Sequence, residues 1–345
     1  MNPLHPLADG EAVAAGFKKQ IPISWGALAL AFLIVPTLPR WVLLGIAPWL
    51  GTIAYYVHGD GRRTAFANLA AAFPGRFDQV ELERTVRACY RSWARTYLDQ
   101  FWTRRITEEN YREYTTYHLP DSQGLEEARK TGAIWMMPHY GNFEWGANNV
   151  AFLGFHYTAI AQDFKNERLT DIFRQNREFH GHQLIPQEKA MLKLLRVLRR
   201  GGNAAFLPDL TVRPSQAATI IKVFGLKASV TILGAFLVKR TGVPVLTGLC
   251  FPCHDGTYFV EGLPALRFSE EATAQEIAQA CWDAVEPKIA AHPEHWLWMY
   301  KHFRFRPAND AEAERYPFYA HRSRAFNKLE STVESGAQEA SLVGD

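Results

Sequence analysis

Short apolar runs separated by helical stretches are the feature that most constrains the fold of this chain. Each run has the length of one buried strand, and the runs lie at Gly132–Met137, Tyr157–Ala161, Ala204–Leu207, Val243–Leu249 and Tyr258–Val260. Between them, Ala190–Arg200 has apolar residues at i, i+3, i+4 and i+7, and Gly201 follows as a typical helix end. Strands that alternate with helices predict an α/β domain with a mixed, largely parallel central sheet flanked by helices.

Changes in the texture of the sequence predict four parts. A flexible lead at 1–20 carries mixed charge with several Pro and Gly residues, and an apolar helical segment follows at 21–60. The main folded domain is predicted at 61–308. From 309 to 345 the chain is polar and rich in Ala, Glu and Ser, so we expect a poorly ordered tail.

Two uncharged runs, Ile21–Leu38 and Trp41–Val57, make up the N-terminal apolar segment. Each is near the lower limit of about 17–25 residues for a helix that spans a bilayer, and prolines interrupt both. The pattern fits a single span, a re-entrant or interfacial hairpin, or a buried helical pair. The uncharged length favours a membrane-associated helical anchor. Basic residues placed to bind anionic headgroups flank it: Lys18, Lys19, Arg40, Arg62 and Arg63.

Charge and cysteine usage exclude some classes of protein. The formal net charge of +3 is too small to indicate nucleic-acid binding, so no nucleic-acid partner is expected. Four scattered cysteines form no disulfide framework and indicate a reducing compartment. Cys250 and Cys253-His254 resemble half of a metal motif, but no second pair accompanies them, and no metal site is predicted.

The segment after Pro138 carries the strongest candidate for chemistry. A strand that ends there delivers His139 to the carboxyl edge of the sheet, where open α/β folds place their sites. Gly141 permits a tight turn, and Asn142 is a good N-cap for a helix. Glu144, in the first turn of that helix, can fold back to the imidazole. The pair then predicts a general base, His139, held in one tautomer by Glu144.

The spacing of His139 and Glu144 is common by chance, and a structural alternative exists. A buried histidine that is hydrogen-bonded near a helix-capping glutamate would show the same pattern. The strand, the Gly-Asn turn and the apolar neighbourhood favour the catalytic interpretation.

The wider sequence resembles the lipid A biosynthesis lauroyl/myristoyl acyltransferases. The block His139–Glu144 resembles that family's His-x4-Asp/Glu block. Further blocks follow in the family's order over about residues 20–307, at Asn68–Pro74, Arg177–Gly181, Leu184–Pro186, Leu207–Asp209, Phe224-Gly225, Thr241–Val245, His292–Glu294 and Trp296–Trp298. The ordered set is more specific than any one of its members.

The resemblance implies a glycerolipid-acyltransferase-like fold and an acyltransferase activity. The donor would be an acyl-carrier-protein thioester, or acyl-CoA, and the acceptor a hydroxyl of a phosphorylated saccharolipid. The catalytic domain would lie on the cytoplasmic face of the inner membrane, and no cofactor is implied. His139 would be the base and Glu144 its partner. The developing oxyanion would meet backbone N–H groups near Gly141–Phe143 or Arg177, and the substrate-binding residues would be Arg177, Asp209, Gly141 and Asn142.

One departure leaves the acceptor open. The family continues its third block with a second acid two residues on, where this chain has Thr211. If that segment borders the acceptor, the lipid could instead be a glycophospholipid, an aminolipid or a polyene-type headgroup. A non-catalytic lipid-binding protein and a soluble thioesterase are the alternatives outside this class, although the chain has no Gly-x-Ser-x-Gly elbow.

A basic helix face could recruit a partner. Lys189, Lys193, Arg196 and Arg200 lie on one side of the helical stretch that ends at Gly201. Such a face could bind an acidic carrier protein or lipid phosphates, or it could be an ordinary solvated surface.

Overall fold

A computed structural model describes residues 34–161, 167–215, 217–308 and 313–336. The predicted lead at 1–20 and the first part of the apolar segment lie outside these residues. The helices of the described chain are α3 (Arg40–Val57), α4 (Gly59–Ala72), α5 (Gln79–Trp102), α6 (Tyr111–Tyr114), α7 (Ser122–Thr131), α8 (Phe143–Asn149), α9 (Glu167–Glu178), α10 (Ala190–Arg199), α11 (Leu233–Thr241), α12 (Ala274–Ala291) and α13 (Arg324–Glu334).

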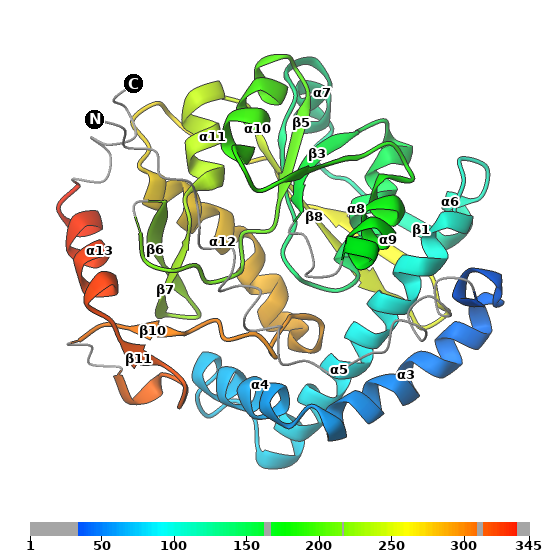
Figure 1. The fold of residues 1–345 in the computed structure, drawn as a ribbon, viewed down its shortest axis with the longest axis horizontal. Coiled ribbons are helices and arrows are strands. Elements are labelled where there is room, and N and C mark those ends of the chain that lie inside the picture. Colours follow the sequence, from blue (N-terminus) through cyan, green and yellow to red (C-terminus); the bar gives the residue numbers. More distant parts are fainter. Residues whose placement is uncertain (1–33, 162–166, 216, 309–312, 337–345) are drawn as a thin grey trace.

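A seven-stranded sheet forms the centre of the molecule (Figure 1). Its strands, in spatial order, are β1 (Thr115–His118), β9 (Tyr258–Gly262), β8 (Val245–Pro252), β2 (Ile134–Met136), β5 (Asn203–Phe206), β3 (Tyr157–Ala161) and β4 (Gln183–Pro186). Strands β8 and β9 pair antiparallel, and the other neighbours pair parallel. The predicted mixed, largely parallel sheet flanked by helices is therefore confirmed.

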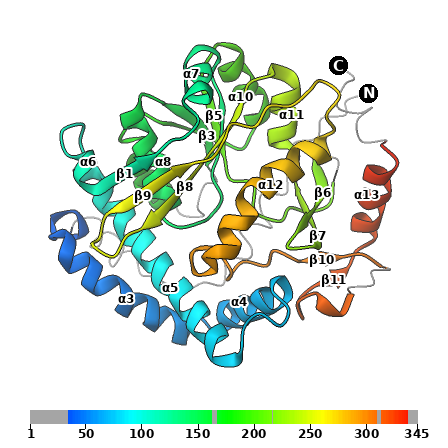
Figure 2. The same cartoon turned by 180° about the vertical axis from the view of Figure 1, so that it is seen from behind.

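Two smaller pairs of strands lie beside the central sheet. They are the antiparallel hairpin of β6 (Ala218–Val223) with β7 (Leu226–Thr231), and the short parallel pair of β10 (Phe305–Arg306) with β11 (His321–Arg322). Both lie with α13 on one side of the molecule, whereas α3, α4 and α5 lie along its lower edge (Figures 1 and 2).

Strand β2 is buried on both faces of the sheet. Ile134 and Met136 join one hydrophobic core, while Trp135 and Met137 join another on the opposite face. Alternate side chains of a strand point to opposite faces, so helices must cover both sides of the sheet at β2. The central position of β2 makes its carboxyl end a fixed platform for the residues that follow.

Helix α3 packs one side against α5 and exposes the other. Leu43, Ala47 and Tyr55 are buried, and a Cβ atom at Gly51 would lie 2.5 Å from the Cα of Arg91. On the outer side, Trp41 is 75% exposed and Trp49 is 74% exposed. The two helices therefore approach closely, and the aromatic residues of α3 remain on the surface.

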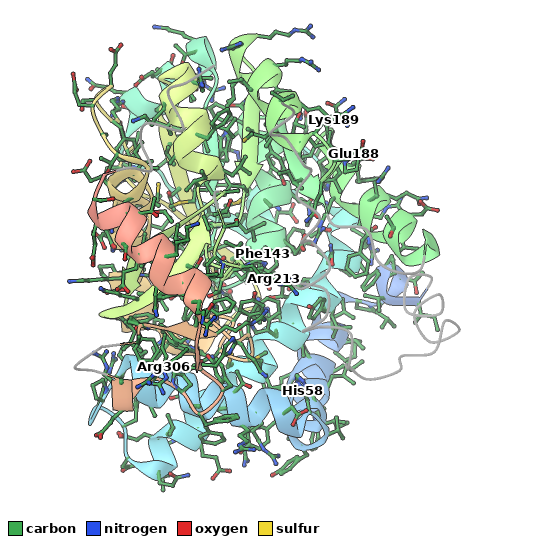
Figure 3. The ribbon with its side chains drawn as sticks, turned by 60° about the vertical axis from the view of Figure 1, so that its left-hand side comes forward. His58, Phe143, Glu188, Lys189, Arg213 and Arg306 are labelled. Atoms are coloured by element: carbon green, nitrogen blue, oxygen red, sulfur yellow. The ribbon has the colours of Figure 1, made fainter. Side chains whose placement is uncertain are left out.

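In its described part, from residue 34 on, the predicted anchor at 21–60 contains no single membrane-crossing helix. Among the described helices, none is by itself long and apolar enough to cross a bilayer. Only α3 and α4 taken together reach that length and composition, and they are bent by 93°. His58 lies at this bend (Figure 3).

The predicted poorly ordered tail contains a packed helix in its described part. Ser323 caps α13 by accepting a hydrogen bond from the N–H of Phe326. Phe326 and Leu329 are buried in a small core with Ala218 and Ile220 of β6. The apolar face of this helix outweighs the polar composition, so the prediction of poor order does not hold for residues 313–336.

Candidate active site

A tight turn between β2 and α8 places His139 at the carboxyl edge of the sheet, as the sequence predicted. Gly141 has φ +58°, a left-handed conformation that favours glycine. The side chain of Asn142 accepts a hydrogen bond from the N–H of Trp145 at 3.0 Å, so the predicted N-cap is confirmed. The first helical turn then carries Phe143 and Glu144.

The turn is clamped to two neighbouring segments by its own backbone. Gly141 N–H donates to the carbonyl of His295, and Asn142 N–H donates to the carbonyl of Cys250, both at 2.9 Å. A Cβ atom at Gly141 would lie 1.9 Å from the Cys250 carbonyl oxygen, so no larger residue fits. Because both N–H groups already have acceptors, Gly141 and Asn142 do not supply the predicted oxyanion donors.

Asp209 is the carboxylate that holds the imidazole. Nδ1 of His139 lies 2.8 Å from Oδ1 of Asp209, and the backbone N–H of His139 donates to Oδ2 at 2.8 Å. Trp296 donates from Nε1 to the same Oδ2, also at 2.8 Å. The paired contacts fix both the ring and its backbone, which leaves Nε2 as the nitrogen available to a substrate.

This geometry corrects the predicted pairing of His139 with Glu144. Asp209 follows β5, which pairs in parallel with β2, so both residues arrive at one edge of the sheet. Glu144 instead points to Arg177, whose Nε donates to its Oε2 at 3.0 Å and whose Nη2 contacts Oε1. Of the four residues predicted to bind substrate, Arg177 and Asp209 thus belong to two different ion pairs.

The electrostatics of Asp209 suit a role beside a base. Burial alone would raise the pKa of its carboxyl group, but the charge and hydrogen bond of His139 and the Trp296 donor hold it below the usual value. The Asp209 side chain is fully buried, whereas that of His139 is 16% exposed. Asp209 is therefore ionised at neutral pH, next to an imidazole that substrate can reach.

Aromatic rings define the walls around the imidazole. Trp93 of α5 stacks on His139 with ring centroids 6.4 Å apart, and Phe143 meets it edge-on at 5.0 Å. Phe143 lies in the central part of the molecule in the view of Figure 3. Aromatic walls exclude water from one side of the base and suit an acyl chain better than a hydrophilic substrate.

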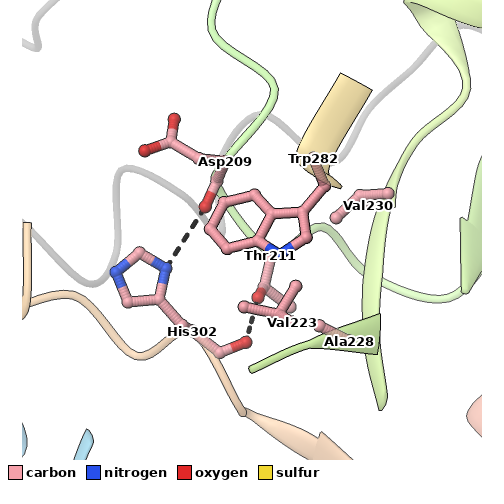
Figure 4. Close-up of a pocket in the computed structure, with 7 residues that line it drawn as sticks. All are labelled: Asp209, Thr211, Val223, Ala228, Val230, Trp282 and His302. Atoms are coloured by element: carbon pink, nitrogen blue, oxygen red, sulfur yellow. Dashed lines mark hydrogen bonds between the residues drawn. The ribbon is translucent and has the colours of Figure 1, made fainter. Parts of the chain in front are cut away.

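Thr211, the departure from the family pattern, faces the interior. Its hydroxyl donates to the carbonyl of His302, and the Tyr300 hydroxyl donates to the Thr211 carbonyl at 2.9 Å. The residue is 4% exposed and lines a cavity of about 10 Å³ beneath Asp209 (Figure 4). The side chain at this position therefore does not border an open acceptor site.

Two supporting residues of the site were missed by the sequence reasoning. Trp296 was noted as part of a family block but was not predicted to bind Asp209, to which it donates a hydrogen bond. Asp99 on α5 accepts from the side chain of Asn142 at 3.2 Å and contacts Arg40. The sequence did contain a signal for Asp99, which lies just before the aromatic pair Phe101-Trp102. A carboxylate buried among aromatic residues needs a charged or hydrogen-bonding partner, so this position indicates a paired acid. No three His, Cys, Asp or Glu residues of the described chain are grouped to hold a metal ion.

Comparisons with known proteins agree with the blocks noted in the sequence. The family model of bacterial lipid A biosynthesis acyltransferases matches residues 16–305. A curated protein of Shigella flexneri, Lipid A biosynthesis acyltransferase 2, is 24% identical over 318 residues, which cover 87% of this chain and 96% of that protein. The family match spans the turn at His139 and both of its flanking ion pairs. The chain therefore belongs to the bacterial lipid A biosynthesis acyltransferase family and is an O-acyltransferase.

Proposed function

We propose that this enzyme moves a fatty acyl chain from an acyl-carrier-protein thioester to a hydroxyl of a lipid A-type saccharolipid precursor. The observation that carries the proposal is the buried Asp209 carboxylate, which holds Nδ1 of His139 at 2.8 Å and leaves Nε2 for substrate. Family membership supplies the acyl-transfer class and the lipid A-type acceptor.

The reaction needs one base and no covalent enzyme intermediate. Nε2 of His139 takes the proton of the acceptor hydroxyl while its oxygen attacks the thioester carbonyl. The tetrahedral intermediate collapses to the ester and breaks the carbon–sulfur bond. The imidazolium returns its proton to the departing thiolate, and Asp209 stabilises the charge on the ring between these two steps. His139 thus ends the cycle neutral.

Arg177 supplies positive charge next to Glu144, in the helical turn that follows His139. Its ion pair with Glu144 has two contacts, and the Glu144 side chain is 8% exposed while that of Arg177 is 31% exposed. The buried carboxylate orients the guanidinium, and the exposed part can meet the developing oxyanion of the thioester. Glu144 accordingly acts through Arg177 rather than through His139.

The donor is proposed to dock near the N-terminal end of α10. Strand β4 ends at Pro186 on the carboxyl edge of the sheet, and α10 begins four residues later. Lys189, which precedes the first turn of α10, is exposed there and can complement an acidic carrier protein. Lys189 and its neighbour Glu188 are labelled at the right-hand side of Figure 3.

We propose a lipid A-type acceptor because Thr211, the residue that left other acceptor lipids open, does not lie at the acceptor surface. Thr211 is buried against His302, so its difference from an acid does not change the surface that an acceptor touches. We also propose that the enzyme works at the cytoplasmic face of the inner membrane. The exposed Trp41 and Trp49 of α3 support contact with lipid, since tryptophan favours the bilayer interface.

The test is acyl transfer by a His139→Ala variant, with the exposed His118→Ala as its matched control. Purified protein is supplied with an acyl-carrier-protein thioester and a lipid A precursor, and mass spectrometry measures the acylated product. Loss of the general base is expected to lower kcat by about 10²–10⁴, and the control should keep wild-type activity. A wild-type rate in His139→Ala would end the proposal. Wild-type enzyme that acylates another lipid, but not this acceptor, would refute the acceptor alone.

A further inference from the structure

A groove on the far side of the catalytic turn has no part in the proposed reaction. It has a volume of about 300 Å³ and lies between α3, the middle of α5 and the turn that joins β8 to β9. Ser92, in its wall, is bonded to Nδ1 of His295 at 3.1 Å, and the His295 carbonyl accepts the Gly141 N–H. The next residue of α5, Trp93, faces His139 instead. The groove and the imidazole therefore lie on different sides of α5.

The two walls of the groove differ in chemistry. Leu44, Ala47 and Pro48 of α3 form an apolar wall. The opposite wall carries the cationic or titratable side chains of Arg91, Arg95, His254 and His295, with Glu294 as the acidic member. A ligand that fits both walls is an amphiphile with an anionic head.

Arg91 is the cation that a ligand can use. Arg95 is already engaged, because its Nη2 donates to the carbonyls of Gly256 at 3.0 Å and Thr257 at 3.2 Å. Arg91 donates only from Nε, to the Thr52 hydroxyl at 3.1 Å, and its two Nη groups contact no acceptor within the described residues. His254 is exposed on the turn that closes the groove. An anion at this end would thus meet a guanidinium that still has donors to give.

The surface next to the groove is apolar and aromatic. Along the outer side of α3, Trp49, Ile53 and Tyr56 are 74%, 56% and 59% exposed. Tryptophan and tyrosine favour the interface between lipid chains and headgroups. A free phosphate ion would use only the cationic wall, whereas a lipid uses the cations, the apolar wall and this outer face together.

We propose that the groove binds the phosphate headgroup of an anionic glycerophospholipid of the bilayer, at a site separate from acyl transfer. The outer face of α3 then lies among the neighbouring acyl chains. The volume is at the lower end of the range of about 300–1,000 Å³ that is typical of ligand sites, which suits a headgroup rather than a whole lipid. This site goes beyond the proposed function, which requires only the donor and the acceptor.

The test compares two charge reversals on one helix face. Arg91→Glu changes the groove, and Arg84→Glu makes the same change seven residues earlier on α5, at an exposed position outside the groove. Co-sedimentation of the full chain with phosphatidylcholine vesicles, with and without phosphatidylglycerol, measures binding. A general attraction of basic residues to the anionic vesicle contributes about five-fold in affinity per charge, so its loss should weaken both variants alike. The groove predicts that Arg91→Glu loses at least about ten-fold more affinity than Arg84→Glu, and only with phosphatidylglycerol present.

Further arms separate the sources of the anion. Thermal unfolding without lipid checks that Arg91→Glu is folded, and His254→Glu on the exposed turn provides a second variant that should also lose vesicle binding. Equal losses in Arg91→Glu and Arg84→Glu would overturn the proposal. The proposal would also be overturned if inorganic phosphate stabilised the wild type but not Arg91→Glu, while Arg91→Glu bound vesicles as well as the wild type. If Arg91→Glu raised the KM for the acceptor in neutral detergent and left vesicle binding unchanged, the groove would be an acceptor subsite. That result would also overturn the proposal. Failure of acyl transfer in His139→Ala has no bearing on these measurements.

Discussion

Two buried aspartates hold the two ends of the catalytic turn, and they do so with different partners. Asp209 binds His139 at one end and takes the indole N–H of Trp296. Asp99 binds the side chain of Asn142 at the other end and contacts Arg40. Their side chains are 0% and 1% exposed. Both carboxylates are equally removed from water, so burial does not distinguish their roles.

The cation opposite each carboxylate makes the difference. An imidazole gains and loses a proton near neutral pH, whereas a guanidinium stays charged. The Tyr258 hydroxyl of β9 also donates to Asp99, so that carboxylate joins β9, α3 and the turn. Asp99 is placed to fix position, and Asp209 is placed to support proton transfer. The comparison teaches that the partner, rather than the acid, separates a structural carboxylate from a functional one.

Asp209→Asn should produce the largest loss of activity. An amide cannot stabilise the imidazolium, so we expect kcat to fall by about 10²–10⁴. Initial rates of acyl transfer measure the effect, and thermal unfolding should show a folded protein. A variant with near-wild-type kcat would remove the distinction between the two aspartates.

Asp99→Asn should instead act mainly on stability. Removing one partner of a buried ion pair leaves Arg40 without its counter-charge, and the free energy of unfolding should fall by about 3–5 kcal/mol. Denaturant unfolding measures this value, with the exposed Asp283→Asn as the control. Below its unfolding transition the variant should keep kcat within about ten-fold of wild type. A loss of activity as large as that of Asp209→Asn, without loss of stability, would contradict the assignment.

The parts of the site that are local in sequence could be predicted, and those that depend on neighbouring strands could not. Gly141 and Asn142 act within one turn, so their roles follow from residue type. His139 meets Asp209 across 70 residues because β5 pairs beside β2. Spacing along the sequence does not reveal which strands are neighbours in the sheet. The acid nearest in sequence, Glu144, was therefore predicted as the partner of His139 instead of Asp209. Its partner Arg177 is 33 residues away on α9 and depends equally on tertiary packing.

The same limit explains which strands were found. The run at Tyr157–Ala161 was predicted with the bounds of β3, because a buried strand is uniformly apolar. Strand β1 lies at the edge of the sheet with polar residues on its exposed side, so no strand was predicted at Thr115–His118. Edge strands carry less of the apolar signal on which the prediction depended.

Trp296→Phe should give a smaller effect that tests the support of Asp209. The change removes one hydrogen bond to a buried carboxylate, worth about 1.5–3 kcal/mol, while it keeps an aromatic ring. Trp298→Phe is the matched control, because Trp298 is equally buried but donates to the Pro293 carbonyl. Both variants should lose stability through packing. Only Trp296→Phe should lower kcat/KM by about ten-fold or more and shift its pH profile. Equal profiles would show that the indole only fills space.

The smallest expected effect extends the comparison to a histidine that has no acidic partner among the described residues. His182 is buried, stacks on Tyr157 at 3.8 Å, and accepts the Tyr157 N–H at its Nδ1. Its Nε2 faces the Asn148 carbonyl at 3.4 Å, which is consistent with a neutral ring. Burial lowers the pKa of His182 to about 4. Its folded form therefore resists the proton that its unfolded form binds near pH 6.5.

The sign of the pH effect follows from that difference. Above pH 6.5 both states leave His182 neutral, and stability is unaffected by it. As pH falls from about 6.5 to about 4, only the unfolded state gains the proton, so the free energy of unfolding falls by up to about 3 kcal/mol. His182→Gln cannot titrate and should flatten this part of the curve, whereas the exposed His321→Gln should not. Burial also lowers the pKa of His302 to about 4, and both variants keep the contribution of His302 to the pH dependence of stability. Denaturant unfolding across this pH range measures the slopes, and equal slopes for wild type and His182→Gln would show that His182 is already charged in the fold.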